Sequence, residues 1–270
     1  MKKILIGLAS ALMAVQSLAA GGGEWFPNHP FTPDLSDQGS LQRGAKYFVN
    51  YCSGCHSLQY QRYNRTFRDL GIDPEIGAKN LILTGAKPVD QMHNAMVDSE
   101  GLKWFGQTPP DLSLTERARG RGYIYNYLQS FYLDESRPLG FNNVVFPGAS
   151  MPNPLWDLEG LRTPTYHEET TCHRNEEGKK DCETHRTING FEIVQAGKLS
   201  PQEYKEVVYD IANFLSYVSD PSAIDRKRIG PWVLTFIFFL TVMFYLLKKE
   251  YWRDIKFKTN PDKPHLGQAE

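Results

Sequence analysis

A five-residue motif, Cys52-Ser53-Gly54-Cys55-His56, constrains the fold of this chain more than any other feature. The pattern C-x-x-C-H is the attachment signature of a c-type haem. Its spacing places the two thiols about one helical turn apart, so that both can add across the vinyl groups of one porphyrin. The histidine that follows is then directed at the iron as its proximal ligand. The motif therefore predicts one covalently attached haem c held by Cys52, Cys55 and His56.

Two other kinds of site also use a C-x-x-C pair, but both explain less of the motif. A zinc half-site or a thioredoxin-like redox pair leaves His56 without a role. The sequence contains no second C-x-x-C that could complete a zinc site. The motif favours haem attachment.

The residues before the motif repeat with helical spacing. Ser40 is a candidate N-cap, and Gly44 would allow another helix to approach closely. We expect a helix that delivers Cys52 to the haem and packs its apolar face on the core. That face consists of Leu41, Ala45, Phe48, Val49 and Cys52.

The sixth iron ligand is less constrained than the proximal one. A methionine ligand raises the potential of an electron-transferring haem. Met151 lies between Pro147-Gly148 and Pro152, and the prolines predict a stiff segment that is neither helix nor strand. Two other methionines lie in PVDQMHNAMVD, which has the pattern of a short amphipathic helix and favours core packing. We expect Met151 to be the ligand. The alternatives are Met92, Met96 and, above all, His93; less constrained are His29, His167, His173 and His185.

The stretch GQTPPDLSLTERARGRGYIYNYLQSFY contains further candidate haem contacts. Ser113 and Glu116 form a capping-box pattern, which predicts a helix running from there towards Phe131. Pro109-Pro110 would present a stiff apolar edge to the porphyrin. A guanidinium is the natural partner of a haem propionate, and the candidates are Arg117, Arg119 and Arg121. We expect at least one of the three to be only part of a solvated basic face.

A second helix is predicted near the end of the main domain. Ser200, Pro201 and Glu203 have the N-cap, first-turn and capping-box spacing, and Pro221 marks the end. An apolar stripe runs between them. We expect this helix to pack on the one that precedes the haem motif.

Cys172 and Cys182 lie in a polar stretch that has the composition of a solvated loop. In an oxidising compartment such a pair most simply forms a disulfide that closes the loop, contributing about 2–3 kcal/mol. The alternative is a metal site formed by Cys172, His173, Cys182 and His185.

The two ends of the chain predict its compartment. Residues 1–20 have the charge, apolar core and small-residue exit of a signal peptide cleaved after Ala19 or Ala20. Their apolar core is shorter than the roughly 20 residues of a membrane span, which disfavours an uncleaved anchor. Residues 230–247 carry no charge and predict a transmembrane helix. Basic residues flank this span on both sides, so the exported N-terminus sets the orientation. Residues 21–225 would then be periplasmic and residues 248–270 a cytoplasmic tail at a bacterial inner membrane.

Composition limits the remaining function classes. The formal net charge of −1 gives no argument for a nucleic-acid partner. Hydrophobic content and 17 prolines favour a mainly helical domain with long, stiffened loops. We find no nucleophile–base pattern and no phosphate-binding glycine loop, so we expect a chain that carries out no catalysis of its own.

Taken in order, these motifs resemble the cytochrome c1 family, the haem c subunits of the quinol–cytochrome c reductase (cytochrome bc1) complex. The resemblance rests on CSGCH, on PPDLS-x-x-x-RAR from Pro109 to Arg119, on FPG-x-x-MP from Phe146 to Pro152, and on a C-terminal anchor followed by KKEYWRD. The segment FNNVVFPGASMPNPLW is similar to the proteobacterial branch. The region around Cys172 does not match a constant feature of the family.

The resemblance implies a mainly α, class I cytochrome c-like domain with inserted loops and one C-terminal transmembrane helix. It implies thioether bonds at Cys52 and Cys55, axial ligands at His56 and Met151, a propionate contact at Arg119 and a haem-facing proline at Pro110.

The family's partners are implied as well: cytochrome b and the Rieske iron–sulfur protein in a dimeric complex, with a soluble or tethered cytochrome c as electron acceptor. On this reading the chain is a non-catalytic electron-transfer subunit. Two other hypotheses remain open, a membrane-anchored cytochrome c of another respiratory complex and a haem-based gas or redox sensor.

Overall fold

The computed structural model describes residues 29–174 and 180–258 of the chain. The predicted signal peptide and residues 259–270 of the predicted tail lie outside this range. The chain divides into two units, Met1–Ser219 and Asp220–Glu270. Helices predominate among the described elements, which confirms the prediction of a mainly α chain.

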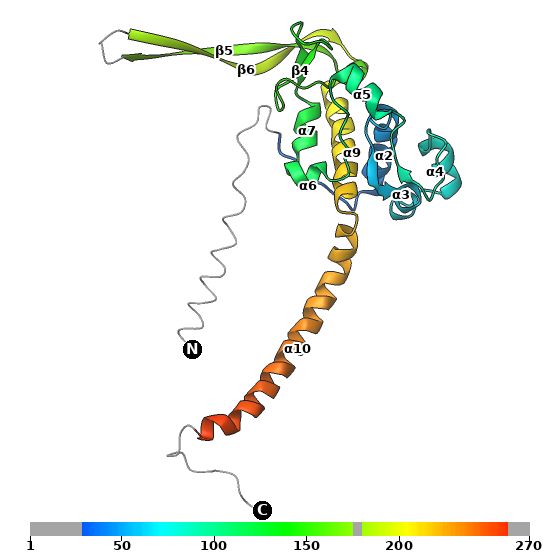
Figure 1. The fold of residues 1–270 in the computed structure, drawn as a ribbon, viewed down its shortest axis with the longest axis vertical. Coiled ribbons are helices and arrows are strands. Elements are labelled where there is room, and N and C mark those ends of the chain that lie inside the picture. The colour runs from blue at the N-terminus through cyan, green and yellow to red at the C-terminus, as the bar shows by residue number, and fades with distance from the viewer. Residues whose placement is uncertain (1–28, 175–179, 259–270) are drawn as a thin grey trace, which may run out of the picture. The chain divides into compact units, whose positions relative to one another are not determined.

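Two helices that lie far apart in the sequence form the core of the first unit. Helices α2 (Gln38–Tyr51) and α9 (Pro201–Ser219) lie side by side (Figure 1). A Cβ added at Gly44 would lie 2.0 Å from the carbonyl oxygen of Asp210, so only glycine allows this approach. The rings of Phe48 and Phe214 lie 5.9 Å apart in the same interface. The predicted packing and the role of Gly44 are confirmed.

The two core helices begin differently. Helix α9 has the predicted capping box, in which the backbone N–H of Ser200 donates to the Glu203 carboxylate at 2.9 Å. At the start of α2 the cap is instead Asp37, whose side chain accepts from the N–H of Ser40 at 2.9 Å. Ser40 lies fully buried inside the helix and binds Asn213 at 3.0 Å. The predicted Ser40 cap is therefore wrong, because a carboxylate three residues earlier satisfies the free N–H.

Short elements follow the haem motif. They are β1 (Leu58–Arg62), α3 (Tyr63–Asp69), α4 (Pro74–Leu81), β2 (Gln91–Met92) and α5 (Asp98–Phe105). Strands β1 and β2 pair antiparallel, with Leu58 opposite Met92. The predicted helix over PVDQMHNAMVD is therefore wrong. The backbone N–H of Asn94 donates to the Ser57 hydroxyl at 2.9 Å, so this segment bonds to the residues after the motif where a helix would need its own backbone carbonyls.

The helix predicted from Ser113 towards Phe131 is two short helices. Helix α6 (Thr115–Arg119) and helix α7 (Tyr123–Leu128) are separated by Gly120 and Gly122, whose φ angles are 97° and 88°. The buried carboxylate of Glu116 accepts from the N–H groups of Gly122 and Ile124, both at 3.1 Å. Glu116 therefore caps the following helix instead of its own, and the predicted capping box is wrong.

Two antiparallel pairs and a short helix complete the first unit. Strand β3 (Phe131–Leu133) pairs with β4 (Phe141–Asn143), and helix α8 (Trp156–Glu159) precedes a long hairpin. The hairpin consists of β5 (Gly160–Arg174) and β6 (Lys180–Ala196) (Figure 1). The polar stretch around Cys172 therefore forms strands, where the sequence suggested a loop. In the hairpin register Cys172 stands opposite Cys182.

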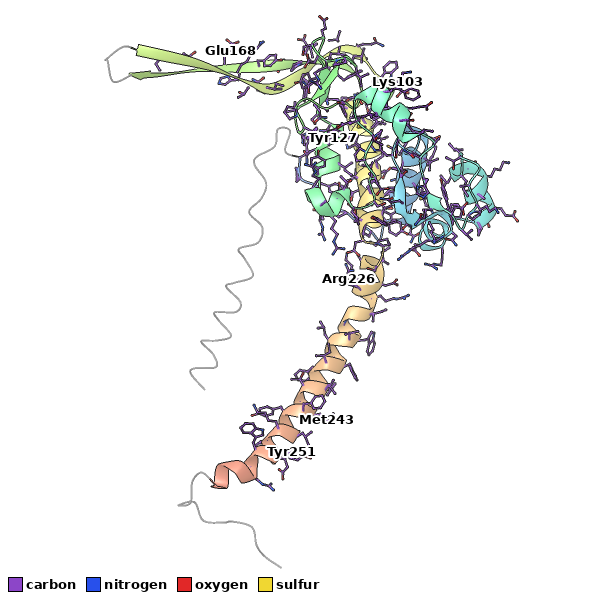
Figure 2. The ribbon with its side chains drawn as sticks, viewed as in Figure 1. Lys103, Tyr127, Glu168, Arg226, Met243 and Tyr251 are labelled. Carbon is purple, nitrogen blue, oxygen red and sulfur yellow. The ribbon has the colours of Figure 1, made fainter. Side chains whose placement is uncertain are left out.

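The described part of the second unit forms one helix, α10 (Ala223–Lys258), which carries Met243 and Tyr251 (Figure 2). Its stretch Ala223–Arg253 is long and apolar enough to cross a membrane and includes the predicted span 230–247. Its apolar side chains are exposed, as at Trp232 (77%) and Phe239 (66%). Such a surface is stable in lipid and not in water.

Candidate functional site

The motif residues lie on one tight turn at the C-terminal end of α2. The N–H of Cys52 donates to the carbonyl of Phe48, and the N–H groups of Cys55 and His56 donate to the carbonyl of Cys52 at 3.0 and 2.8 Å. Both cysteines are free. Burial raises the pKa of Cys52 to about 12 and also raises the pKa of Cys55, so both are neutral thiols. Two thiols and a histidine therefore share one turn, as the motif predicts.

The tautomer of His56 is set by a backbone carbonyl. Its Nδ1 lies 2.7 Å from the carbonyl oxygen of Pro110. Because a carbonyl only accepts, Nδ1 carries the proton and Nε2 is left with its lone pair. Burial lowers the pKa of His56, which keeps the ring neutral. A neutral imidazole with a fixed Nδ1–H is the form that binds a metal through Nε2.

The segment that supplies this carbonyl is bonded to the residues after the motif. The N–H of Leu112 donates to the carbonyl of Ser57 at 2.9 Å, and the N–H of Gln59 donates to the Asp111 carboxylate at 2.8 Å. These bonds hold Pro110 beside His56. The sequence pointed to the proline side chain as a haem neighbour, while the contact seen here is made by the proline carbonyl.

Met151 lies in an irregular segment between β4 and α8, as its prolines predicted. Its side chain is half-buried. The hydroxyl of Tyr127, on α7 (Figure 2), donates to Met151 Sδ at 3.7 Å. Burial raises the pKa of Tyr127, so the phenol is protonated and can donate. The assignment of Met151 as an iron ligand stays a prediction.

Asparagine side chains shape the segment before Met151. The fully buried Asn143 donates through its amide to the carbonyl of Tyr127 at 2.8 Å. Its side-chain oxygen accepts from the N–H groups of Val145 and Phe146 at 3.0 and 3.1 Å. Sequence reasoning missed this residue. The available signal was an Asn-Asn pair before a Pro-Gly turn, because asparagine side chains commonly cap turns.

A buried ionic cluster lies after Met151. Asn153 Nδ2 donates to Glu159 Oε2 at 3.1 Å, and Glu159 Oε1 lies 2.8 Å from Arg162 Nη1. Burial raises the pKa of Glu159 to about 7, against the opposing effects of Arg162 and Asn153. Burial also lowers the pKa of Arg162. Sequence reasoning missed this cluster too.

Arg119 is exposed and lies beside aromatic rings. Its guanidinium carbon is 5.6 Å from the ring centroid of Tyr123 and 6.0 Å from that of Phe146. Tyr123 in turn stacks on Tyr127 at 5.8 Å. The structure thus groups Arg119 with the neighbours of Met151, while His56 and Pro110 form a separate contact. The propionate contact of Arg119 stays a prediction, and Arg117 and Arg121 are also exposed.

The competing ligand candidates have other surroundings. Met92 is buried at 4% exposure and accepts a contact from the Thr66 hydroxyl at 3.7 Å, which agrees with core packing. His93 is exposed, with Nε2 3.2 Å from the side-chain oxygen of Gln91. Among the described residues no group of three or more histidines, cysteines and carboxylates could hold a metal ion. The side chains of His173, Cys182 and His185 lie outside that description.

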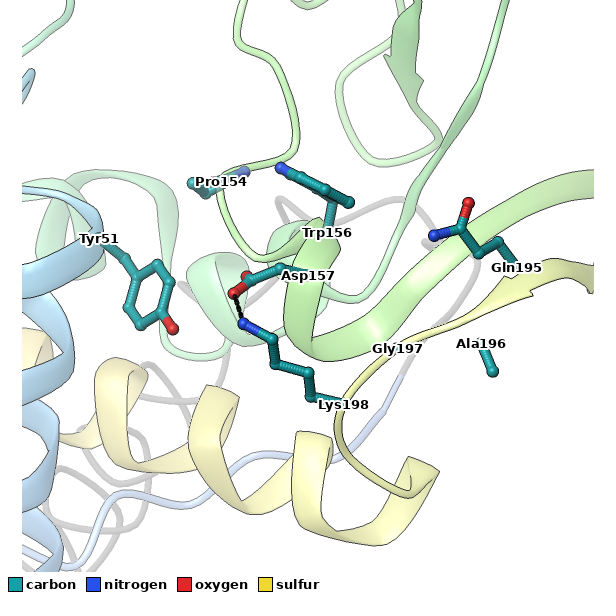
Figure 3. A pocket seen from close by; sticks show the side chains of 8 residues that line it. All are labelled: Tyr51, Pro154, Trp156, Asp157, Gln195, Ala196, Gly197 and Lys198. Atoms are coloured by element: carbon teal, nitrogen blue, oxygen red, sulfur yellow. Dashed lines mark hydrogen bonds and ion pairs between the residues drawn. The ribbon is translucent and has the colours of Figure 1, made fainter.

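A cleft opens beside the site (Figure 3). Tyr51, which precedes Cys52, lines one side, and Pro154 and Trp156, which follow Met151, line the other. Asp157 and Lys198 form an ion pair of 3.1 Å within it. The cleft therefore borders both segments that carry predicted iron ligands.

The sequence model of the Cytochrome C1 family matches residues 28–181 and 192–255, which include the whole site. The chain belongs to the cytochrome c1 family. The match is interrupted at residues 182–191, within β6, so it includes Cys172 and not Cys182.

Relatives support the family assignment. Cytochrome c1 of Allochromatium vinosum is 48% identical over 255 residues, covering 94% of this chain and 100% of the relative. A protein named ammonia monooxygenase gamma subunit, from Nitrosomonas europaea, is 39% identical over 82% of this chain and 86% of its own. Cytochrome c1 of Rhodospirillum rubrum is 25% identical over 82% of this chain and 83% of its own.

The cytochrome c1 family implies haem c, and the residues present fit that group. Two neutral thiols lie on one turn with a histidine whose Nε2 is available. A methionine sulfur lies half-buried in a segment without regular structure. Thiols, imidazole and thioether are the donor set of a His/Met-ligated haem c.

Proposed function

We propose that this chain is the haem c subunit of a quinol–cytochrome c reductase (cytochrome bc1) complex. It would accept electrons from the Rieske iron–sulfur protein and pass them to a soluble or tethered cytochrome c. The observation that carries the proposal is the His56 turn, in which two free thiols adjoin an imidazole whose Nδ1–H is held by the Pro110 carbonyl. The relative of the same family, at 48% identity over nearly the full chain, supports it.

The chain holds one haem, because its sequence contains a single C-x-x-C-H. Cys52 and Cys55 would form the thioether bonds, and His56 and Met151 would be the ligands of the iron. When bound, haem c supplies a one-electron Fe(III)/Fe(II) couple. Arg119 meets a propionate, and Pro110 orients His56. The chain itself performs no substrate or proton chemistry and acts as an electron-transfer subunit.

The chain is anchored in a bacterial inner membrane by the span at 230–247. Support comes from the length and apolar character of α10 and from Lys248 and Lys249 directly after the span. Residues 1–20 are removed as a signal peptide, residues 21–225 are periplasmic and residues 248–270 face the cytoplasm. Its partners in the membrane are cytochrome b and the Rieske protein, within a dimeric complex.

Cys172 and Cys182 form a disulfide across the β5–β6 hairpin. Their opposed positions in the strand register support this pairing, and Cys172 is a disulfide-bonded residue. An exported compartment would keep such a bond oxidised.

Purification in mild detergent through this chain tests the assignment. We expect a cytochrome b and a Rieske protein to co-purify, together with quinol-dependent reduction of cytochrome c. Isolation of the haem protein without either partner would contradict the proposal and favour a membrane-anchored cytochrome c of another complex. The co-purifying proteins would also show whether the role named for the Nitrosomonas europaea relative applies to this chain.

Optical spectroscopy tests the ligand set. Met151→Leu should remove the charge-transfer band of a methionine–iron bond, whereas His93→Ala should retain it. Survival of the band in Met151→Leu would show that another residue is the ligand. Rapid carbon monoxide binding by the reduced unaltered protein would instead favour a sensor.

A further inference from the structure

Arg162 and Glu159 form a buried ion pair at the start of the β5–β6 hairpin. Their side chains are only 15% and 8% exposed, and Arg162 Nη1 lies 2.8 Å from Glu159 Oε1. Removing two charges from water is costly, so such a pair persists only where further hydrogen bonds complete it. Arg162 Nε donates to the carbonyl of Phe131 at 2.7 Å, and Nη2 donates to the carbonyl of Gln129. The face of the guanidinium lies 4.1 Å from the ring centroid of Phe191.

One arm of this cluster reaches the Met151 segment. The second carboxylate oxygen of Glu159 accepts from Asn153 Nδ2 at 3.1 Å. The side-chain oxygen of Asn153 accepts from the N–H of Leu155 at 3.0 Å. Asn153 is 4% exposed and lies two residues after Met151. The chain that leaves Met151 is thus tied to the ion pair.

The other arm reaches helix α7. The carbonyls of Gln129, at the C-cap of this helix, and of Phe131, the first residue of β3, accept from Arg162. The same helix carries Tyr127, whose hydroxyl contacts Met151 Sδ at 3.7 Å. The guanidinium therefore joins the two segments that meet at the methionine sulfur.

We propose that Arg162, acting through Glu159 and Asn153, is a positioning residue that holds Met151 in place as an iron ligand. This inference rests on the proposed ligand role of Met151. A guanidinium suits the task because its planar fork can bond a carboxylate and two carbonyls in fixed directions at once. The ammonium of a lysine offers a point charge without that geometry.

A role in stability alone gives a different expectation. In that case loss of Arg162 would lower the free energy of unfolding but leave iron ligation unchanged in the molecules that remain folded. The two roles are therefore separated by spectroscopic readouts on folded holoprotein.

The test compares Arg162→Gln and Arg162→Lys with a matched control, Arg186→Gln. Arg186 lies in the same hairpin and also stacks on an aromatic ring, that of Tyr166, at 3.6 Å, but its side chain is 59% exposed. The full-length holoproteins, in detergent, are assayed for the methionine–iron charge-transfer band, carbon monoxide binding by the reduced form and midpoint potential. Loss of this outer support should weaken methionine ligation by about tenfold.

We expect Arg162→Gln to lose most of the band, to bind carbon monoxide faster and to have a lower midpoint potential. Arg162→Lys should lie between it and the unaltered protein, and Arg186→Gln should match the unaltered protein. Unchanged band, carbon monoxide binding and potential in Arg162→Gln would overturn the proposal.

Asn153→Ala is the second variant, in case Arg162→Gln does not accumulate. It breaks the link to Met151 and leaves the ion pair intact, so loss of the band is expected here too, and a normal band would overturn the proposal. Met151→Leu, measured in parallel, separates the two levels of inference. If Met151→Leu keeps the band, the ligand assignment fails. If it loses the band while Arg162→Gln or Asn153→Ala keeps it, only the positioning role fails.

Discussion

The two sides of the candidate haem site are built on different principles. On the proximal side, Cys52, Cys55 and His56 lie within five consecutive residues, which backbone bonds of a single turn bring together, and the backbone carbonyl of Pro110 sets the tautomer of His56. On the Met151 side, the segment has no regular structure and is held by side-chain contacts, from Tyr127 at 24 residues' distance and from Asn143, whose amide also bonds the Tyr127 carbonyl. Backbone groups thus set one side, and side-chain contacts set the other.

This difference predicts which substitutions should disrupt each side. The proximal side should fail only when the helix pair α2–α9 fails, because no single side chain sets the direction of the turn. The Met151 side should lose its geometry through single polar substitutions while the haem stays covalently attached. Four predictions test this contrast, from the largest expected effect to the smallest.

Substitution in the interface between α2 and α9 should have the largest effect on stability. Gly44→Ala would put a methyl group 2.0 Å from the carbonyl oxygen of Asp210. We expect the free energy of unfolding to fall by about 3 kcal/mol or more, measured by chemical denaturation. Gly39→Ala, on the same helix, would meet only the ends of the Arg43 and Asp37 side chains at 3.3 Å. An equal loss in Gly39→Ala would contradict the prediction.

The cap of α7 should give the Met151 side a dependence on pH. Burial raises the pKa of Glu116 from its ordinary 4.5 to about 7, so the folded state binds this proton more tightly than the unfolded state. Its contribution to stability is therefore full below about pH 4.5 and is lost as the pH rises through 7, by up to about 3 kcal/mol. In Glu116→Gln the fall in the free energy of unfolding between pH 5 and 8 should become smaller by this amount, while Glu159, whose pKa burial also raises to about 7, keeps its own part.

Glu203, in the cap of α9, should give stability a pH dependence of the opposite sign. The hydroxyl and N–H of Ser200 lower the pKa of Glu203, so its contribution is present above pH 4.5 and is lost in acid. Glu203→Gln should leave the slope between pH 5 and 8 unchanged. An unchanged slope in Glu116→Gln, or a reduced slope in Glu203→Gln, would contradict the assignment.

Substitution of Asn143, whose side chain supports the segment before Met151, should have the next largest effect. Asn143→Ala removes the acceptor for the N–H groups of Val145 and Phe146. We expect a loss of about 2 kcal/mol and partial loss of the methionine–iron band, with the haem still attached after denaturing electrophoresis. Asn80→Ala, at an exposed position on α4, should change neither quantity. An unchanged band in Asn143→Ala would show that the segment holds its shape without this side chain.

The phenol contact to Met151 should have the smallest effect. Tyr127→Phe removes the hydroxyl that donates to the Met151 sulfur. This hydrogen bond withdraws electron density from the ligand and thereby favours the reduced iron. We expect a lower midpoint potential in a redox titration and a loss of stability under about 1 kcal/mol. Tyr125→Phe is the matched control, because Tyr125 lies on the same helix and packs on Phe31 at 5.2 Å. A raised or unchanged potential in Tyr127→Phe would refute the electronic role of the hydroxyl.

Sequence alone determined the features that depend on local spacing. The C-x-x-C-H turn, the helices around Gly44 and after Ser200, and the apolar run at 230–247 follow from periodicity within one segment. The irregular segment around Met151 was also predictable, because proline restricts its own backbone and that of its neighbours.

Only the tertiary structure decided the features that depend on partners far away in the chain. Met92 lies in a strand because Leu58 stands opposite it, and Glu116 caps a helix that begins beyond two glycines of positive φ. Arg162 bonds carbonyls 31 and 33 residues away, and Tyr127 meets Met151 across 24 residues. No local pattern encodes these contacts. A buried polar group must find a partner, and the partner is known only when the chain has folded.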